Sequence, residues 1–591
     1  MEILRSVLQQ LPEFQQLLAA LDSGQSPAAV SGLAAVHRAH FAACLGQESG
    51  RPVVVVCADE GEAERMARDL SFLTGGEVPV LAARSFLFHN IATVSRQWEH
   101  RRLRLLYRLT RGEVPCLVAT VEALLQRTLP PEALERACTV LAVGQTADLE
   151  ELTAHLTEAG YVRCEQVEGP GQFALRGGIL DVYSPAMEAP VRAEFFGDEV
   201  DALGIFDPVT QRRTANVEQA VLLPAAETLP HLAPGGLAGL LKQLDQRSAA
   251  AVRDGLEELA ATLRQDREAL EEGRSFPAAD RYLPLIYPEL ATAADYLPYD
   301  ACVLFSESSR VGERAKTWQW QLEEDVKTLL ERGELDGACG ALSRSYDQLC
   351  RRLEDFPFAY LDSFALSAYP AAPRCVLSLM AKQLPSFGAS LETAVQDLSH
   401  YQSAGFSVLV LVSSEQRALN LQTLLREQKV KAGVDFALKA LPRPGQIFLT
   451  VGGLSGGMEY PGLKLAVITE GQSGGVRKRP RPVKKEATNR QKLKSYADLS
   501  PGDLVVHEHH GVGRYVGMVK MPADGIEKDY VKIAYAGTDV LYVPATQLDL
   551  VSKYIGGGED AQETKKLSKL GGTDWERAKT KAKKAVADLA K

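Results

Sequence analysis

Residues 169–213 constrain this chain more than any other stretch, because short segments of alternating polarity there carry both arginines and phenylalanines. Alternation over residues 191–196 (VRAEFF) predicts a β-strand with different side chains on its two faces. One face carries Val191, Ala193 and Phe195, and the other carries Arg192, Glu194 and Phe196. A core needs only one of the two phenylalanines. The second, beside Arg192, indicates a protein-binding surface that Arg176 can join, because arginine and large aromatic residues anchor interfaces.

This stretch closely resembles the domain that the UvrB repair helicases share with the Mfd transcription-repair-coupling factors. In that family the domain docks the damage sensor UvrA. Carried over position by position, the resemblance implies UvrA contacts at Arg176, Arg192 and Phe196. From the residues alone a second interpretation stays open, in which Arg192 pairs with Glu194 or Asp198 and Phe196 packs under a neighbouring loop.

Length and composition are those of a multidomain globular protein. The 591 residues correspond to roughly four domains of about 150 residues each. Residues 1–14 (MEILRSVLQQLPEF) have the pattern of an amphipathic helix rather than a signal peptide, and no run of about 18 apolar residues occurs. We therefore expect a cytoplasmic protein without membrane contact.

The cysteines and histidines do not form a metal-binding pattern. The nine cysteines are scattered, with no CxxC pair and no histidines beside them at ligand spacing. The histidines within residues 507–510 point to alternating faces of a predicted strand, so we reject a metal site there. We expect no disulfide framework, and most cysteines to be buried as small apolar residues.

The net charge of −10 argues against a surface that binds nucleic acid along its whole length, because phosphate binding needs concentrated positive charge. Two local basic segments remain, residues 477–494 (RKRPRPVKKEATNRQKLK) and the tail from Lys565 onward. The prolines and the lack of periodicity in the first segment favour a solvated linker, although a DNA contact stays open. We expect any binding to DNA to be weak.

The N-terminal part has the pattern of a parallel α/β sheet. Residues 52–57 (PVVVVC) form an apolar, β-branched run, and the helical pattern of residues 60–73 follows it. Further short strands are predicted at residues 78–81, 115–119 and 139–143. These segments predict a RecA-like layer, which the stretch 169–213 interrupts and the helix-rich residues 232–353 resume.

A second α/β unit is predicted from Cys375 onward, after a loop rich in proline and aromatic residues. Residues 406–412 (FSVLVLV) predict a strand, and Ser413 and Ser414 are good N-cap residues for a helix over 415–428. Residues 463–469 predict a last strand. The sequence assigns no role to this unit.

The predicted RecA-like layer lacks the residues that bind a nucleotide. A phosphate-binding loop needs closely spaced glycines followed by Lys and by Ser or Thr, yet Gly-Lys occurs nowhere in the chain. Residues 30–40 (VSGLAAVHRAH), where UvrB-like proteins carry that loop, have one glycine and no lysine. After the strand that begins at residue 301, Ser306 stands where a magnesium-binding Asp is required, which leaves only Glu307. We expect neither ATP hydrolysis by this chain nor a cofactor.

The C-terminal part predicts a small β-domain. Strand patterns at residues 503–506, 507–521, 530–535 and 540–543, with glycines at the bends, are typical of a Tudor-like barrel. Alternation puts Tyr515, Gly517, Val519 and Met521 on one face. Pro522 then removes a backbone donor, which indicates the end of an edge strand that is open to a partner. From the residues alone, Met521 as an ordinary core residue stays an alternative.

Residues 502–518 (GDLVVHEHHGVGRYVGM) and 541–554 (LYVPATQLDLVSKY) resemble the RNA polymerase interaction domain that Mfd shares with CarD-type transcription factors. The resemblance implies the β subunit of RNA polymerase as a partner and Met521 as an apolar contact. Around it we include Val519, Lys520 and Tyr530.

A lysine-rich helix with an apolar stripe is predicted from Thr573 onward. In the Mfd family the corresponding helix leads into a DNA translocase. We therefore expect the N-terminal portion of such a factor, without its motor.

The residues and the two resemblances predict a multidomain α/β protein. The expected domains are a degenerate RecA-type domain in two parts (1–136 and 214–360), an inserted α+β UvrA-binding domain (137–213), a further α/β domain (361–475), a basic linker (476–496), a small CarD-type β-barrel that binds RNA polymerase (497–555) and a hinge with a helix (556–591). The leading hypothesis is an adaptor that links RNA polymerase stalled at DNA lesions to UvrA. An active UvrB-type helicase and a DNA-binding regulator of CarD type are the alternatives.

Overall fold

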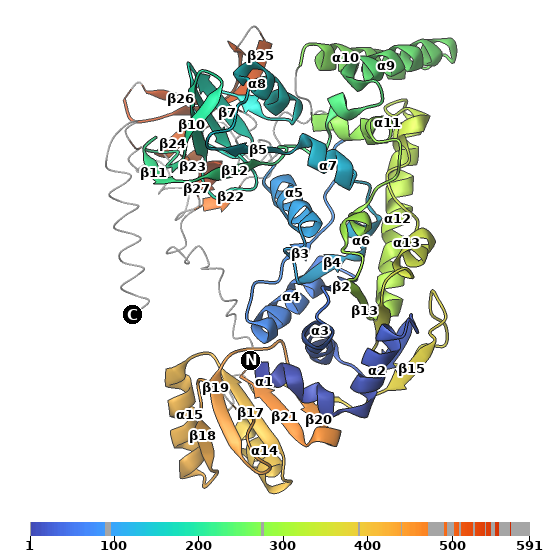
Figure 1. The fold of residues 1–591 in the computed structure, drawn as a ribbon, viewed down its shortest axis with the longest axis vertical. Helices are drawn as coiled ribbons and strands as arrows, with labels where there is room; N and C mark the ends of the chain where they lie inside the picture. The colour runs from blue at the N-terminus through green and yellow to red at the C-terminus, as the bar shows by residue number, and fades with distance from the viewer. Residues whose placement is uncertain are drawn as a thin grey trace.

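The computed structural model describes residues 2–88, 96–273, 277–387, 391–438, 440–470, 490–492, 502–507, 510–523, 526–537, 539–544, 550–554 and 568. These residues form five β-sheets and the helices around them (Figure 1). The mixed α/β, multi-sheet class predicted from the sequence is therefore confirmed. In Figure 1 the inserted β-rich domain and the further α/β sheet lie at opposite ends of the largest sheet and its helices.

The largest sheet has seven strands in the order β15-β1-β14-β13-β2-β4-β3. Every pair of neighbouring strands in it is parallel. The strands are β1 Ala28–Ser31, β2 Val53–Cys57, β3 Val80–Leu81, β4 Cys116–Thr120, β13 Cys302–Ser306, β14 Phe358–Leu361 and β15 Cys375–Ser378. All five residues of β2, β4 and β13 are buried, as expected for a parallel sheet that is covered on both faces.

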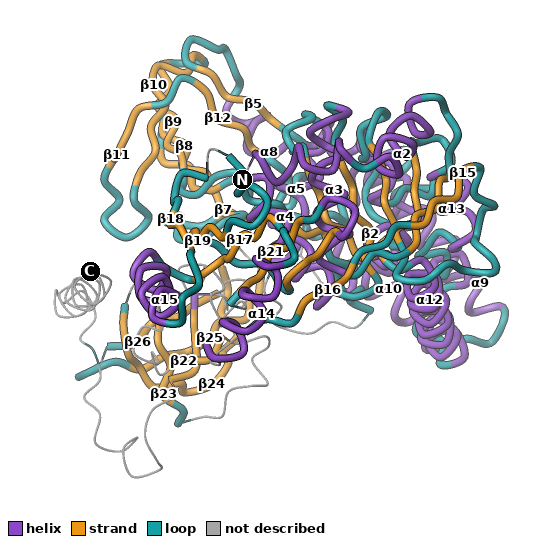
Figure 2. The backbone as a smooth tube through the Cα atoms, turned by 90° about the horizontal axis from the view of Figure 1, so that it is seen from below, coloured by secondary structure: helices purple, strands orange, loops and turns teal. Residues whose placement is uncertain are grey.

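Alternate residues of β2 enter two different cores. Val54 and Val56 pack into a cluster with residues of α5, α6, α7, α9, α10, α12 and α13, whereas Val53 and Val55 pack with residues of α1 to α4. Figure 2 shows several of these helices, among them α3, α4 and α5, beside the strands. Their bounds are α1 Glu2–Ser6, α2 Pro12–Asp22, α3 Ala35–Ser49, α4 Glu60–Thr74, α5 Gln97–Thr110, α6 Val121–Leu125, α7 Pro131–Ala137, α9 Gly236–Arg253, α10 Glu257–Glu271, α11 Leu283–Ile286, α12 Ser308–Glu331 and α13 Tyr346–Leu353.

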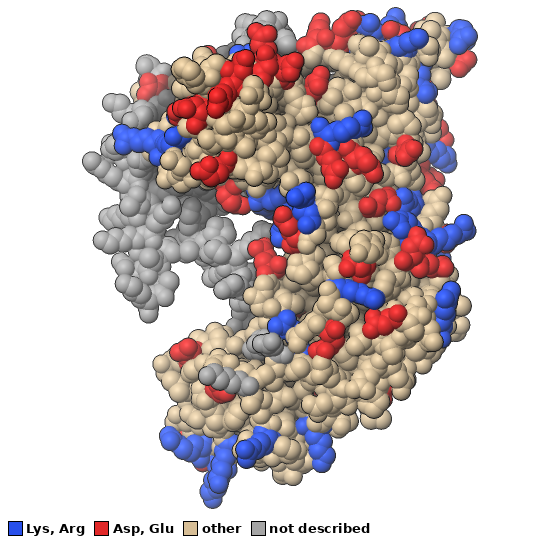
Figure 3. All heavy atoms as spheres, in the orientation of Figure 1, with Lys and Arg blue, Asp and Glu red and all other residues tan. Residues whose placement is uncertain are grey.

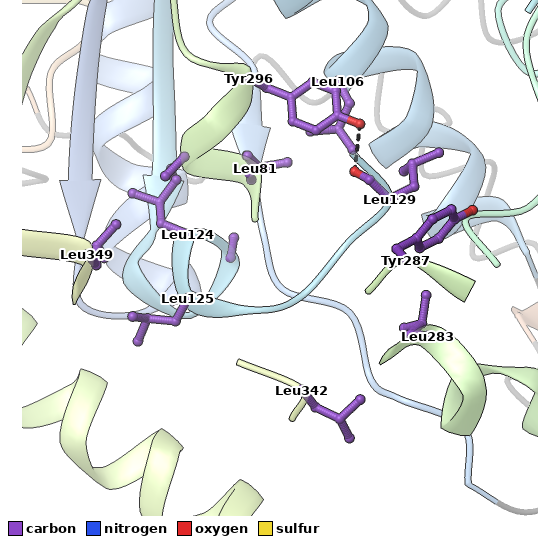
Figure 4. Packing of buried hydrophobic residues seen from close by; sticks show 14 of the residues in the cluster. Leu81, Leu106, Leu124, Leu125, Leu129, Leu283, Tyr287, Tyr296, Leu342 and Leu349 are labelled. Carbon is purple, nitrogen blue, oxygen red and sulfur yellow. Dashed lines mark hydrogen bonds between the residues drawn. The ribbon is translucent and has the colours of Figure 1, made fainter. Parts of the chain in front are cut away.

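The core beside α6 is built from leucines and tyrosines (Figure 4). Leu124 and Leu125 of α6 are fully buried, and Leu106 of α5 lies in the same cluster. The buried Tyr296 hydroxyl donates a hydrogen bond of 2.9 Å to the Leu129 carbonyl. A buried tyrosine adds large apolar area without an unsatisfied polar group when its hydroxyl finds such an acceptor.

Two predicted strands belong to sheets other than those we expected. Residues 139–143 were expected in the RecA-like layer, but β5 (Thr139–Ala142) pairs antiparallel with β12 (Gln219–Leu222) in a separate two-stranded sheet. Cys375 was expected to begin the further α/β unit, but β15 pairs in parallel with β1 at the edge of the seven-stranded sheet. Both errors have one cause, because the sheet to which each strand belongs is decided by pairing with a strand that lies far away in the sequence.

The inserted domain contains a six-stranded sheet in the order β11-β10-β9-β8-β7-β6. Its strands are β6 Val162–Arg163, β7 Gln172–Arg176, β8 Ile179–Tyr183, β9 Val191–Phe196, β10 Glu199–Phe206 and β11 Arg213–Asn216. Helix α8 (Leu149–Glu158) and the pair β5–β12 share one core with this sheet. Strand β11 continues past residue 213, where we expected the domain to end, because it pairs with β10.

The further α/β unit has a six-stranded sheet in the order β16-β20-β21-β17-β19-β18. Its elements are β16 Lys382–Leu384, α14 Leu391–Ser403, β17 Ser407–Val412, α15 Glu415–Glu427, β18 Ala432–Val434, β19 Ile447–Val451, β20 Gly457–Tyr460 and β21 Leu465–Thr469. The predicted N-cap is confirmed, since the Ser414 side chain accepts a hydrogen bond from the Arg417 amide.

The further α/β unit shares a core with the N-terminal helices. Leu409, Leu411 and Tyr460 pack in the same buried cluster as Phe14 and Phe41. A Cβ on Gly452 would lie 2.3 Å from the Phe72 ring, so the contact with α4 requires glycine at that position.

The C-terminal strands form a six-stranded antiparallel sheet in the order β22-β27-β23-β24-β25-β26. They are β22 Arg490–Lys492, β23 Leu504–His507, β24 Gly511–Ala523, β25 Ile526–Ala534, β26 Val540–Pro544 and β27 Val551–Tyr554. The basic segment that we expected to be a linker therefore contributes an edge strand, β22, which pairs with β27. The helix predicted from Thr573 onward lies outside the described residues.

A β-bulge changes the face assignment predicted for β24. The register against β25 shifts between Tyr515 and Gly517, so Tyr515 is buried, Val516 is 44% exposed and Met518 packs against the core. The prediction that Tyr515, Gly517 and Val519 share one face is therefore wrong, because the extra residue of a bulge reverses the alternation. Pro522 does not end the strand either, since it pairs with Glu527 within β24 and β25.

The cysteines behave as small apolar residues. None of the nine, all of which lie in the described part of the chain, forms a disulfide, and Cys44, Cys57, Cys116, Cys302, Cys339 and Cys350 are buried. Burial raises the pKa of Cys116 to about 12, which keeps its thiol protonated. Within the described part of the chain, no helix is both long and apolar enough to cross a membrane.

Candidate docking surfaces and the nucleotide-site region

Three adjacent strands bring the two predicted contact arginines to one face of the inserted domain. Strand β8 lies between β7 and β9, and its Asp181 stands directly opposite Arg192 of β9. Arg176 is the last residue of β7, and it pairs in register with Ile179 at the start of β8. A β-strand repeats its face every second residue, so Ile179 and Asp181 share the face to which both arginines turn.

Asp181 is the common partner of both arginines. Arg192 donates from Nε to Asp181 Oδ1 at 2.6 Å and from Nη2 to Oδ2 at 2.8 Å. Arg176 donates from Nη2 to the same Oδ2 at 2.7 Å. Asp181 itself is 0% exposed. Two guanidiniums thus share one buried carboxylate, which leaves one positive charge more than Asp181 balances.

Arg192 is held more firmly than Arg176. Its guanidinium also lies 4.6 Å from the centroid of the Phe206 ring and donates from Nη1 to the Gln211 carbonyl at 3.3 Å. The hydrogen bonds that Arg192 donates to Asp181 raise the pKa of Arg192 above its ordinary value. The Arg176 side chain is 52% exposed, against 19% for Arg192. Much of the Arg176 guanidinium is therefore open to solvent, whereas only a small part of the Arg192 side chain is exposed.

Phe196 projects into solvent at the end of β9. It is 84% exposed, whereas Phe195 on the other face packs against the core of the inserted domain. The next residue, Gly197, has φ 62°, a turn conformation that favours glycine. The second interpretation of this stretch is wrong in both respects, since Phe196 is not covered by a loop and Arg192 pairs with Asp181. Glu194 instead pairs with Arg213 at 3.3 Å.

The loop between β1 and α3 stands where a phosphate-binding loop was sought. Its backbone amides are already engaged, since Gly32 donates to the Ser363 carbonyl at 3.3 Å and Leu33 donates to the Asp362 carbonyl at 3.0 Å. Gly32 has φ 90°, and a Cβ there would lie 2.0 Å from the Leu379 carbonyl oxygen. Close packing against the segment after β15 therefore accounts for this glycine.

A buried arginine connects this loop to the end of β13. Arg38 of α3 is 4% exposed and donates from Nε to Ser306 Oγ at 2.9 Å. It also donates to the Glu307 carboxylate and to the Leu33 carbonyl, the latter at 2.8 Å. Glu62 of α4 lies 3.7 Å from Arg38 Nη2 and accepts a hydrogen bond of 2.8 Å from the Ser306 hydroxyl. Arg38 thus contacts two carboxylates, Glu62 and Glu307, inside the protein at this edge of the sheet.

Glu307 adopts an unusual backbone conformation at the junction of β13 and α12. Its φ of 61° and ψ of 76° lie in the left-handed region, which is uncommon for a residue other than glycine. Such strain costs on the order of 1–3 kcal/mol and persists only where the surroundings enforce it. The Glu307 carboxylate accepts hydrogen bonds from Arg38 and from the Ser363 hydroxyl, which hold it in place.

The C-terminal sheet positions part of the second predicted surface. Val519 of β24 is half-buried and pairs in register with Tyr530 of β25, which is also half-buried. The backbones of Lys520 and Met521 belong to β24, but their side chains lie outside the described residues. Among the described residues, no group of three or more His, Cys, Asp and Glu side chains is arranged to hold a metal ion.

Two parts of the chain match known domain families. Residues 140–227 match the UvrB interaction domain, and residues 499–555 match the CarD-like/TRCF RID domain. The first match contains the Arg176, Arg192 and Phe196 surface, and the second contains strands β23 to β27. Along its whole length, the chain is similar to transcription-repair-coupling factors.

The similarity to transcription-repair-coupling factors extends over several species. The chain is 31% identical over 597 residues to the factor of Bacillus subtilis, a match that covers 100% of this chain and 50% of that protein. It is 29% identical over 573 residues to the factor of Staphylococcus haemolyticus, covering 95% of this chain and 48% of that protein. The chain thus spans about half the length of these relatives.

Sequence reasoning missed the acidic centre of the docking surface and the arginine at the nucleotide-site region. Asp181 stands within an otherwise apolar strand (ILDVY), and a buried polar residue in such a strand is a signal that it has a partner. Arg38 lies one turn into α3 between two histidines, on a helix whose other neighbouring residues are buried. An arginine in a buried stretch likewise predicts an acid nearby, although the sequence does not say which one.

Proposed function

We propose that this chain is an adaptor that links RNA polymerase stalled at DNA lesions to UvrA and so to nucleotide excision repair. The observation that carries the proposal is the pair of domain matches on one chain, residues 140–227 and 499–555. One domain supplies a surface for the repair machinery and the other a surface for the transcription machinery. A protein with both surfaces can hold the two machineries together.

UvrA is the proposed partner of the surface formed by Arg176, Arg192 and Phe196. An exposed phenylalanine beside two oriented guanidiniums has the composition of an interface anchor, and its surplus positive charge favours a partner with an acidic group. Phe196 is 84% exposed, so the surface needs no rearrangement to bind.

The β subunit of RNA polymerase is the proposed partner of the C-terminal sheet. Beyond Arg514, where its pairing with β23 ends, β24 pairs with β25 alone among the residues that the structure describes. Such an open edge accepts a strand from another protein through backbone hydrogen bonds. We propose that Met521, Val519, Lys520 and Tyr530 form this contact.

We propose that the chain itself does not hydrolyse ATP. The Gly32 and Leu33 amides donate to carbonyls of the protein, and the Arg38 guanidinium is bound by Glu307 and Ser306. A phosphate would have to displace these partners. Translocation along DNA is proposed only for the full-length factors, which are about twice as long as this chain.

The face shown in Figure 3 gives little support to the DNA-binding alternative. Basic and acidic side chains are interspersed over the face in Figure 3, and no continuous basic surface is visible there among the described residues. Weak contact with DNA through residues 477–494 is the most that we propose.

The proposal is tested by isothermal titration of the purified chain with UvrA and, separately, with the RNA polymerase β subunit. We expect saturable binding to each protein and no heat from ATP with magnesium. Micromolar ATP binding would favour the helicase alternative instead. Steeply salt-dependent binding to duplex DNA that is lost on neutralising residues 477–485 would favour the CarD-type regulator.

A further inference from the structure

Asp181 occupies an unusual position for a carboxylate. It stands in the middle of β8, is 0% exposed and accepts three hydrogen bonds, all from the two arginines of the docking surface. A buried carboxylate is costly unless it is paired, so its retention at the centre of an apolar strand requires a specific partner. Here the partners are two side chains of the site itself.

The arginines reach this carboxylate from opposite sides. Arg192 comes from the paired position on β9, and Arg176 comes from the end of β7. A free arginine side chain populates many rotamers, and ordering it on binding weakens affinity. The hydrogen bonds to Asp181 order both guanidiniums before any partner arrives.

We propose that Asp181 is the positioning residue of the docking surface, which orients Arg176 and Arg192 for UvrA without touching UvrA itself. This role rests on the proposed function, because it concerns the same surface. Phe196 does not take part in it, since it is held by the turn at Gly197.

The test uses Asp181→Asn, which keeps the shape of the side chain but removes its charge. The charge-assisted hydrogen bonds from both arginines are weakened, so we expect the Kd for UvrA to rise about tenfold. Asp266→Asn is the matched control. Asp266 is also buried and bound to an arginine and a tyrosine, but it lies on α10, outside the inserted domain. It should leave the Kd unchanged.

A double-mutant cycle separates positioning from a merely structural role. In an Arg176→Gln/Arg192→Gln background the amide nitrogen at position 192 can take the place of Arg192 Nε as a donor to Asp181, but no guanidinium remains to be oriented. If Asp181 acts through the arginines, adding Asp181→Asn there changes the Kd less than about twofold. Circular dichroism and binding to the RNA polymerase β subunit check that each variant is folded.

Two results would overturn this role. One is an Asp181→Asn variant that binds UvrA as tightly as the wild type. The other is an equal loss of affinity with and without the arginines, because Asp181 would then act through the fold of the domain. Separately, unchanged binding by the Arg176→Gln/Arg192→Gln variant would remove the docking surface itself, and with it any role for Asp181 there.

Discussion

The Arg38 guanidinium donates a 2.9 Å hydrogen bond to the Ser306 hydroxyl and thereby joins the first helix after β1 to the end of β13. In a nucleotide-binding sheet these two places would face the phosphates and the magnesium ion. In this chain they face each other. The contact therefore fills the edge of the sheet where a nucleotide would otherwise lie.

Arg38→Met is expected to destabilise the N-terminal domain by about 3 kcal/mol, because it leaves the Glu307 and Glu62 carboxylates without their buried partner. Urea unfolding followed by circular dichroism measures the loss. Arg310→Met is the control, since Arg310 also pairs with Glu62 but is 51% exposed, and it should cost less than about 1 kcal/mol.

A second change sharpens the test of Arg38. Adding Glu307→Gln to Arg38→Met removes one of the unpaired charges, so part of the lost stability should return. If Arg38→Met is as stable as the wild type, the buried network does not hold the sheet together.

Phe196→Ala is expected to weaken UvrA binding by at least about 1 kcal/mol, as the loss of an interface anchor does. Phe196 is 84% exposed, so the stability of the domain should change by less than about 0.5 kcal/mol. Trp320→Ala, which removes an aromatic side chain 61% exposed on α12, is the control and should bind normally.

Arg176→Ala and Arg192→Ala are expected to weaken UvrA binding by at least about 1 kcal/mol each. Arg192→Ala should also lower the stability of the inserted domain, because Arg192 makes more contacts within the fold than Arg176 does. Normal UvrA affinity in both arginine variants and in Phe196→Ala would refute the assignment of this surface.

Met521→Arg is expected to abolish binding to RNA polymerase while the C-terminal sheet stays folded, since it places a charge in an apolar contact. Surface plasmon resonance against the polymerase β subunit measures the loss, and unchanged binding to UvrA serves as the control. A folded variant that still binds polymerase would exclude Met521 from the contact.

His37→Leu is expected to make the chain less sensitive to acid. Burial lowers the pKa of His37 to about 3, below its ordinary value near 6.5, so between these pH values the unfolded chain binds a proton that the folded chain excludes. The folded protein therefore has its full free energy of unfolding, as far as His37 is concerned, above about pH 6.5. Protonation of His37 in the unfolded chain lowers this free energy as the pH falls, by about 2 kcal/mol at pH 5.

Comparing the wild type with His37→Leu separates the effect of His37 on the pH dependence of stability from that of Asp69, which acts in the opposite direction. Burial raises the pKa of Asp69 to about 6, which adds stability as the pH falls toward 5. Unfolding free energies at pH 7 and pH 5 should therefore differ by about 2 kcal/mol less in His37→Leu than in the wild type. Equal pH dependence of the two proteins would contradict the buried, neutral state of His37.

Local pattern was enough to predict the elements of this fold but not all of their partners. The apolar run that became β2 and the N-cap at Ser414 follow from residues next to one another. The placement of β5 and β15 depends on strands far away in the sequence, which no local pattern contains. The bulge at Tyr515–Gly517 was not predictable from the sequence, because a bulge inserts one residue without changing the composition of the strand.

The face on which Arg192 and Phe196 lie was predictable from the sequence, but the hydrogen bonds that organise this candidate docking surface were not. Alternation within residues 191–196 is sufficient to put Arg192 and Phe196 on the face opposite Phe195. That Asp181 binds both arginines depends on the register of β7, β8 and β9, and an acid close in sequence, Glu194, was the more obvious partner for Arg192.

The proposal that one chain joins UvrA to RNA polymerase can be tested by capturing UvrA on immobilised RNA polymerase with and without this chain. We predict that UvrA is retained only when the chain is present, that Phe196→Ala retains the chain but loses most of the UvrA, and that Met521→Arg loses both. If the wild-type chain is captured but UvrA is not, the chain does not join the two proteins. If Phe196→Ala, Arg176→Ala and Arg192→Ala all retain as much UvrA as the wild type, UvrA does not bind through this surface.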